Sequence, residues 1–165
     1  MQIMDKGDII GIFQGLEKDE VFLSSRMSPE DSNYNCIAWA YQLMEDRWMW
    51  PPVDEEGNDF KPLDGYPWWP EGAKIGLDIE CLVDVFDKKG FAICENWKHE
   101  EGYVKVALYY DPNTGKMTHA ARECRTKRAW MSKLGKGNDI HHKNPYTIEG
   151  NIYGKVYCIM KKEDK

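Results

Sequence analysis

The chain has 165 residues, of which 42% are hydrophobic and 30% are charged, and its formal net charge is −6 at pH 7. This length and composition predict one globular domain, residues 1–165, that buries a substantial core. The acidic balance argues against a nucleic-acid partner, because binding to phosphates requires a concentrated basic surface.

Two further features bear on the compartment. Asp5, Lys6 and Asp8 interrupt the first apolar residues, so a secretion signal is not expected, and no other apolar run approaches the roughly 20 residues that span a bilayer. The five cysteines are odd in number and irregularly spaced, which favours reduced thiols over a disulfide framework. We therefore expect a cytoplasmic protein without a membrane partner, although a protein injected by a dedicated secretion system would also lack a signal.

The N-terminal part of the chain predicts an arm followed by helices. Residues 1–27 carry short apolar runs separated by charges, which is typical of a strand pair or an extended arm. The segment Ser28–Asp31 has the form of a helix start, with a hydroxyl cap and a proline at the first helical position. A second start follows, where Asn33 or Asn35 can cap a helix over about residues 36–46 whose apolar positions recur at helical spacing.

The rest of the chain predicts one more helix and then an antiparallel sheet. Apolar residues at i, i+3, i+4 and i+7 indicate a helix over about residues 76–88. From Tyr103 the hydrophobic period changes to two, and turn-forming residues separate the runs. We expect strands at residues 91–94, 103–110, 117–124, 129–134 and 152–160, with a charged tail over residues 161–165. Helices packed on such a sheet make an α+β fold.

The candidate nucleophile is Cys36, at the predicted start of an apolar helix. The amides and the dipole of a helix N-terminus stabilise negative charge, so we expect the pKa of this thiol to lie below the usual value of about 8.5. The backbone amide of Cys36, with a side chain from Asn33 or Asn35, can receive the oxyanion that forms on an attacked carbonyl.

The candidate base is His119, on a predicted strand beside small residues that leave room for a substrate. A cysteine nucleophile requires a base and a third group that orients it. The chain then folds back toward this strand, and Asp139 on the returning segment is our choice for the orienting role. The further candidates at this position are Ser132, Asn138 and His142.

This order resembles the papain-like superfamily, in particular its compact NlpC and CHAP branches. In those proteins a cysteine opens a helix, a histidine follows on a strand of an antiparallel sheet, and a polar residue lies on the next strand. The resemblance covers about residues 33–142. It implies a thiol hydrolase that needs no cofactor and acts on an amide, peptide or isopeptide bond of a peptide or protein substrate.

A more specific resemblance rests on short motifs over about residues 33–160. The chain is similar to an uncharacterised bacterial family without an established activity. This chain has His141 where that family has an acidic residue, which leaves Asp139 and His142 as the orienting candidates there. The motifs are Asn35–Ala40, Arg47–Pro51, Trp69–Pro70, Lys105–Tyr109, Thr118–Arg122, Ser132–Gly135 and Asp139–His142.

Simpler interpretations stand beside these. Cysteine is often just a buried core residue, and the histidines together with a cysteine can form a zinc site, but no Cys-x-x-Cys or His-x-x-x-His spacing is present, so no metal is expected. The proline- and tryptophan-rich segments can pack on the core or wall a cleft for an extended peptide or a sugar-peptide chain. The cleft candidates are Trp39, Trp48, Trp50 and Trp69.

The sequence therefore predicts a papain-like thiol hydrolase in which Cys36 attacks, His119 exchanges the proton and Asp139 orients the imidazole. Two other functions remain open: a non-catalytic peptide- or protein-binding or effector module on the same fold, and an acyltransferase that uses the same thiol.

Overall fold

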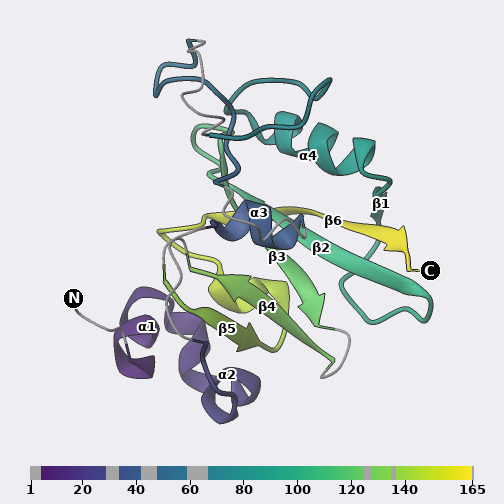
Figure 1. The fold of residues 1–165 in the computed structure, drawn as a ribbon. Helices are drawn as coiled ribbons and strands as arrows, with labels where there is room; N and C mark the ends of the chain where they lie inside the picture. Colours follow the sequence, from purple (N-terminus) through teal and green to yellow (C-terminus); the bar gives the residue numbers. More distant parts are fainter. Residues whose placement is uncertain are drawn as a thin grey trace.

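The computed structural model describes residues 5–28, 34–41, 48–58, 67–124, 128–134 and 137–164. Within these residues, six strands form one antiparallel sheet in the order β1-β6-β2-β3-β4-β5. Helices cover both of its faces, with α4 on one side and α1 and α2 on the other (Figure 1). The fold is therefore α+β, as predicted.

The strands follow the predicted period of two closely. They are β1 Ala92–Cys94, β2 Tyr103–Tyr110, β3 Met117–Cys124, β4 Ala129–Lys133, β5 Asp139–His142 and β6 Lys155–Glu163. β2 and β3 are joined by the predicted turn, in which Gly115 has a φ of 75°, a conformation that strains any residue with a Cβ. The sequence did not predict β5, and residues 161–163, expected in a charged tail, continue β6.

The prediction of a strand pair or an extended arm over residues 1–27 is wrong. The described part of this segment forms α1 Lys6–Ile12, η1 Gln14–Lys18 and α2 Glu20–Ser24. Asp5 begins α1 with a capping box, and the carboxylate of Asp19 accepts from the amide of Phe22 at the start of α2. The helical period was hidden because three short helices interrupt it, of which α1 and α2 begin at their own caps.

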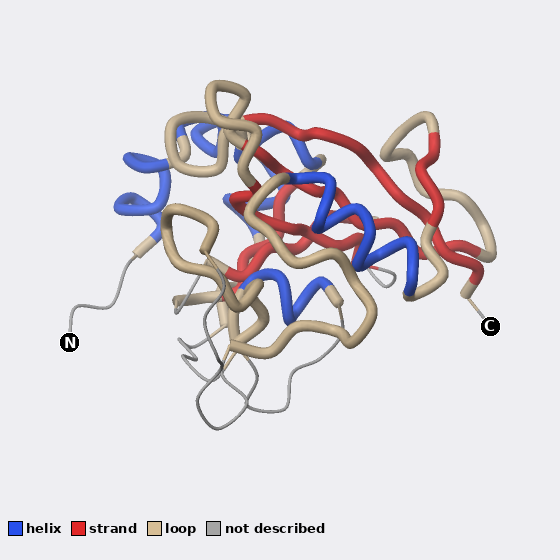
Figure 2. The backbone as a smooth tube through the Cα atoms, turned by 90° about the horizontal axis from the view of Figure 1, so that it is seen from above, coloured by secondary structure: helices blue, strands red, loops and turns tan. Residues whose placement is uncertain are grey.

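The N-terminal helices form what we name the α1-side core, which covers one face of the sheet. Its buried residues include Ile9, Leu16, Phe22, Tyr109, Trp130 and Ile140. Figure 2 shows α4 crossing over the strands on the opposite face. There, α3 Cys36–Ala40 and α4 Ile79–Lys88 form the α4-side core, which includes Ile37, Leu82, Phe86, Leu108 and Ala120.

The structure confirms that α3 begins at Cys36 and that Asn35 is its cap. The remainder of the helix predicted to reach residue 46, and the helix start predicted after Ser28, lie largely outside the described residues. α4 is confirmed, beginning at Ile79 rather than near residue 76. Among the described helices, none combines the length and the apolar character that crossing a membrane requires.

Candidate functional site

Asn35 fixes the position of the cysteine helix. Its side-chain oxygen accepts from the backbone N–H of Ala38 at 3.1 Å and from that of Met49 at 3.1 Å, and its amide nitrogen donates to the carbonyl of Met49 at 2.8 Å. The side chain is buried, so these bonds are shielded from water. Asn35 therefore caps α3 and holds the Met49 segment against it, and this structural use differs from the oxyanion role expected from the sequence. Asn33, the other candidate for that role, lies outside the described residues.

The Cys36 thiol is buried at the N-terminus of α3, with 7% of the residue exposed. The amides of Ala120, Ile37 and Cys36 itself, and the charge of Lys133, all lower its pKa. Burial outweighs them, because desolvation penalises a thiolate, and raises the pKa of the Cys36 thiol to about 11. The expectation of a lowered pKa at this position is therefore wrong: the resting thiol is protonated.

His119 lies on β3 with its side chain toward the α1-side core. It is paired across the sheet with Tyr109, and its ring stacks on Tyr153 with centroids 3.8 Å apart and planes 9° apart. The residue is fully buried, which lowers the pKa of its imidazole well below the usual value, and the nearby His142 adds to this effect. His119 is therefore a neutral imidazole at neutral pH.

A chain of hydrogen bonds runs from His119 across β4 to β5. Nε2 of His119 lies 3.0 Å from Oγ of Ser132, which lies 2.8 Å from Nε2 of His142. Nδ1 of His142 lies 2.8 Å from the backbone carbonyl of Asn144. Within the described residues, Nδ1 of His119 has no hydrogen-bond partner.

The donor and acceptor in each of these hydrogen bonds can be assigned by starting from the Asn144 carbonyl, where the chain of bonds ends. A carbonyl only accepts, so Nδ1 of His142 carries a proton; burial lowers the pKa of His142 to about 4, so its Nε2 carries none at neutral pH. Ser132 must then donate to His142 and accept from Nε2–H of His119. The relay therefore leaves Nδ1 of His119 as a buried, unprotonated nitrogen with a lone pair that can take a proton.

The helix that carries Cys36 packs on β3, the strand that carries His119, but the two side chains belong to the cores on different faces of the sheet. Cys36 belongs to the α4-side core, whereas His119 contacts Tyr109 and Tyr153 of the α1-side core. The amide of Ala120, the residue after His119, interacts with the sulfur. The charge of Cys36 also helps to raise the pKa of Tyr153. Tyr153 therefore lies near both groups, although no hydrogen bond joins Nδ1 of His119 to the thiol in the described part of the chain.

Asp139 is not the residue that contacts the His119 imidazole. It pairs with Lys133 on β4, and its backbone exchanges hydrogen bonds with Ser28. Ser132 instead pairs with Ile140 and shares the face of His119. Adjacent residues of a strand point to opposite faces, so Asp139, which pairs with the residue after Ser132, does not share the face of His119. Ser132 therefore takes the orienting position expected for Asp139, and His142 lies behind it.

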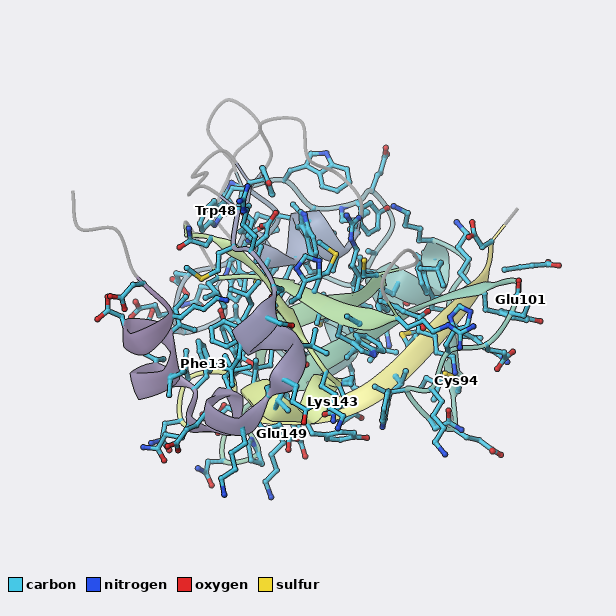
Figure 3. All side chains as sticks on the ribbon, turned by 90° about the horizontal axis from the view of Figure 1, so that it is seen from below. Phe13, Trp48, Cys94, Glu101, Lys143 and Glu149 are labelled. Atoms are coloured by element: carbon cyan, nitrogen blue, oxygen red, sulfur yellow. The ribbon has the colours of Figure 1, made fainter. Side chains whose placement is uncertain are left out.

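The tryptophans divide between packing and surface. Trp39 is 2% exposed, with the guanidinium of Arg122 4.1 Å from its ring, so it cannot wall an open cleft. Trp69 is half-buried and donates from its indole to the carbonyl of Lys74 at 2.9 Å. Trp50 is also half-buried and lines a surface hollow. Trp48 lies at the end of the molecule away from Cys94 and Glu101 (Figure 3).

Sequence reasoning missed two neighbours of the site, the half-buried Tyr153 and the fully buried Lys133. Tyr153 lies within a turn bounded by Gly150 and Gly154. The two glycines flanking an aromatic residue are the sequence signal from which this turn could have been predicted. Lys133 is fully buried on β4, with its ammonium 4.8 Å from the Tyr34 ring and 3.0 Å from the carbonyl of Gly137. The alternating pattern of β4 gives no sign of its burial.

The fold and the site define an α+β protein in which a buried cysteine and a buried histidine–serine–histidine relay meet at one strand. The chain belongs to the family described as "Domain of unknown function (DUF7689)", whose model matches residues 25–161. The matched region contains Cys36, His119, Ser132 and His142, and α1 lies before it. No curated protein and no solved structure matches the chain.

Proposed function

We propose that the protein is a papain-like thiol hydrolase that cleaves an amide, peptide or isopeptide bond of a peptide or protein substrate. The observation that carries this proposal is the unprotonated Nδ1 of His119, which the relay through Ser132 and His142 leaves without a hydrogen-bond partner among the described residues. A buried acceptor without a hydrogen-bond donor lowers the stability of the folded protein, so its presence in a native structure calls for a functional explanation. Accepting the proton of the Cys36 thiol accounts for this lone pair.

The order of the groups also supports a papain-like arrangement. The nucleophile opens α3, the base lies on β3, and its polar partner Ser132 lies on β4, the adjacent strand. α3 contacts both of these strands. The role that the resemblance gives to one polar residue is here taken by the serine–histidine pair, so Asp139 has no part in the proposed mechanism.

Both groups are neutral at rest, so the chemistry begins with general-base catalysis. Nδ1 of His119 takes the proton of Cys36 as the sulfur attacks the carbonyl carbon, and Ser132 accepts from the Nε2–H of the resulting imidazolium. The backbone amide of Cys36 is a donor for the oxyanion. The imidazolium then protonates the leaving amine, and water hydrolyses the thioester. Substrate binding must first bring the sulfur within hydrogen-bonding distance of Nδ1, because catalytic contacts often tighten only in the complex.

The test is covalent labelling by peptide-like electrophiles. Short peptides that end in an acyloxymethyl ketone are incubated with the full chain, and labelled cysteines are mapped by tandem mass spectrometry. We expect selective labelling of Cys36, although the raised pKa makes this thiol slow toward iodoacetamide. His119→Ala should lower the labelling rate by about 10²-fold or more, the range of general-base catalysis.

The controls separate chemistry from folding. Cys81→Ala removes a half-buried thiol elsewhere in the molecule and should leave the rate unchanged. Circular dichroism must show that His119→Ala remains folded, and Ser132→Ala provides a second, milder variant of the same relay. The proposal is wrong if no peptide probe labels Cys36, or if the rate of a folded His119→Ala variant equals that of the native chain.

One observation favours a second function, a non-catalytic peptide- or protein-binding module. The resting thiol, with a pKa of about 11, makes no hydrogen bond to the imidazole within the described residues, which also suits a purely structural cysteine. This alternative predicts peptide binding that survives Cys36→Ala, with no acyl-enzyme formed. A thioester that is captured by an added amine in preference to water would instead indicate an acyltransferase.

A further inference from the structure

A surface hollow of about 540 Å³ is lined by residues from the segment that follows Met49 and from the start of β3. Four of its lining residues are apolar and four are charged: Trp50, Val53, Leu77 and Met117, and Asp54, Glu55, Glu56 and Lys116. Its size falls in the range of side-chain and small-ligand sites.

Hydrogen bonds fix the Trp50 wall of the hollow relative to Cys36. Met49, the neighbour of Trp50, is held by two bonds to the side chain of Asn35, which directly precedes the cysteine. The amide of Trp50 donates to the carbonyl of Trp68 at 3.1 Å. This wall is therefore connected to the start of α3 through a single buried side chain.

The opposite wall is fixed relative to His119. Met117 lies two residues before the histidine on β3, and its amide donates to the carbonyl of Leu77 at 2.8 Å. Two residues of a strand span about 7 Å. The Met117 wall therefore lies two strand residues from the proposed base, and Met117 and the proposed nucleophile Cys36 both belong to the α4-side core.

The charges around the hollow specify the kind of side chain. Three carboxylates face one ammonium, that of Lys116, which donates to the backbone carbonyl of Glu55 at 3.3 Å. Asp54 is used within its own turn, where its side chain accepts from the amides of Glu56 and Asn58. The exposed carboxylates of Glu55 and Glu56 form no ion pair within the described part of the chain.

We propose that this hollow binds a lysine or arginine side chain of the substrate, so that the protein acts on peptides with a basic residue beside the scissile bond. Such a side chain lays its apolar stem on the apolar residues of the hollow and directs its charged end to Glu55 and Glu56. The Trp50 indole adds an aromatic surface that attracts cations. This substrate class rests on the proposed hydrolase function, but the hollow can be tested without it.

The test compares the binding of two blocked peptides to the full chain carrying Cys36→Ala, in which no thiol chemistry can occur. Acetyl-Ala-Ala-Lys-Ala-Ala-amide and its norleucine counterpart have side chains of similar length and differ in charge. We expect the lysine peptide to bind about tenfold more tightly at low ionic strength, the combined effect of an exposed ion pair and a cation–π contact, and the preference to shrink in salt. Isothermal titration calorimetry measures the affinities, and the indole N–H resonance of Trp50 reports the place of binding.

A charge-matched pair of variants locates the effect. The double variant Glu55→Gln, Glu56→Gln should bind the lysine and norleucine peptides with nearly equal affinity. Glu17→Gln with Glu20→Gln makes the same change in net charge at exposed positions among the N-terminal helices and should keep the preference. Equal affinity for the two peptides, no binding of either, or a preference that survives the Glu55 and Glu56 substitutions overturns the inference. Peptide labelling of Cys36 tests the hydrolase function separately.

Discussion

The imidazole of His119 lies almost parallel to the phenol ring of Tyr153, with ring centroids 3.8 Å apart. Tyr153 is held in place by a turn in which Gly150 and Gly154 exchange backbone hydrogen bonds at 3.0 and 2.8 Å. Its carbonyl also accepts from the hydroxyl of Thr118, the residue before His119. The turn therefore places an aromatic ring on the candidate base and shields it from water.

The first prediction concerns this stack. Tyr153→Ala should lower the free energy of unfolding by about 3 kcal/mol, the cost of truncating a packed aromatic side chain. It should also raise the pKa of His119 toward 6.5, because water then reaches the ring. Urea unfolding and NMR titration of the His119 ring measure the two effects. Tyr153→Phe, which keeps the stack, is the matched control, and a similar change in both variants would contradict the shielding role.

The second prediction concerns the two histidine tautomers. At pH 7, His119 should carry its proton on Nε2 and His142 on Nδ1, because the carbonyl of Asn144 fixes the direction of the relay. Long-range ¹H–¹⁵N correlation spectra identify the protonated nitrogen of each ring. In Ser132→Ala, His119 loses the acceptor at Nε2, so a fraction of its Nδ1–H tautomer should appear. Finding Nδ1–H as the main tautomer of the native His119 would remove the basis of the proposed base.

The sequence predicts the sheet well because strand alternation is a local pattern. The residues at 103–110 and 117–124 alternate and are separated by a strong turn, so β2 and β3 appear where the pattern places them. The cap at Asn35 was also predictable, since an N-cap is defined by residues a few positions apart. The N-terminal helices were missed because each is at most seven residues long, too short to show a helical period.

The site depends on sheet register, which no local pattern encodes. A shift of one residue in the pairing of two strands moves every side chain to the other face of the sheet. Ser132 and Asp139 were both candidates from their order in the chain, but only Ser132 lies on the face of His119 and bonds to its imidazole. The raised pKa of Cys36 was mispredicted for a related reason. The helix terminus is visible in the sequence, but the burial that outweighs it depends on the packing of distant segments.

The third prediction concerns Asn35. Asn35→Ala removes the cap of α3 and both bonds to Met49, so the free energy of unfolding should fall by about 3 kcal/mol. Asn35→Ser keeps a capping hydroxyl but loses the two hydrogen bonds to Met49, so the free energy of unfolding should fall by about half as much. Chemical denaturation measures both variants. Equal losses of stability in the two variants would show that the cap contributes nothing. A loss below about 0.5 kcal/mol in Asn35→Ala would show that Asn35 neither caps α3 nor holds the Met49 segment to any useful extent.

The fourth prediction is a loss of stability in mild acid. Burial lowers the pKa of His142 from its usual value of about 6.5 to about 4 in the folded protein, and it also lowers the pKa of His119. Below pH 6.5 the unfolded chain therefore binds protons that the folded chain does not, so this contribution to stability is complete above pH 6.5 and is lost as the pH falls toward 4. By pH 5, where most carboxylates remain ionised, His142 alone should account for about 2 kcal/mol. Urea unfolding between pH 7 and pH 5 measures the slope. His142→Gln removes this titrating group, so its stability should change less over the same interval, and identical slopes in the two proteins would show that His142 is not buried as a neutral imidazole.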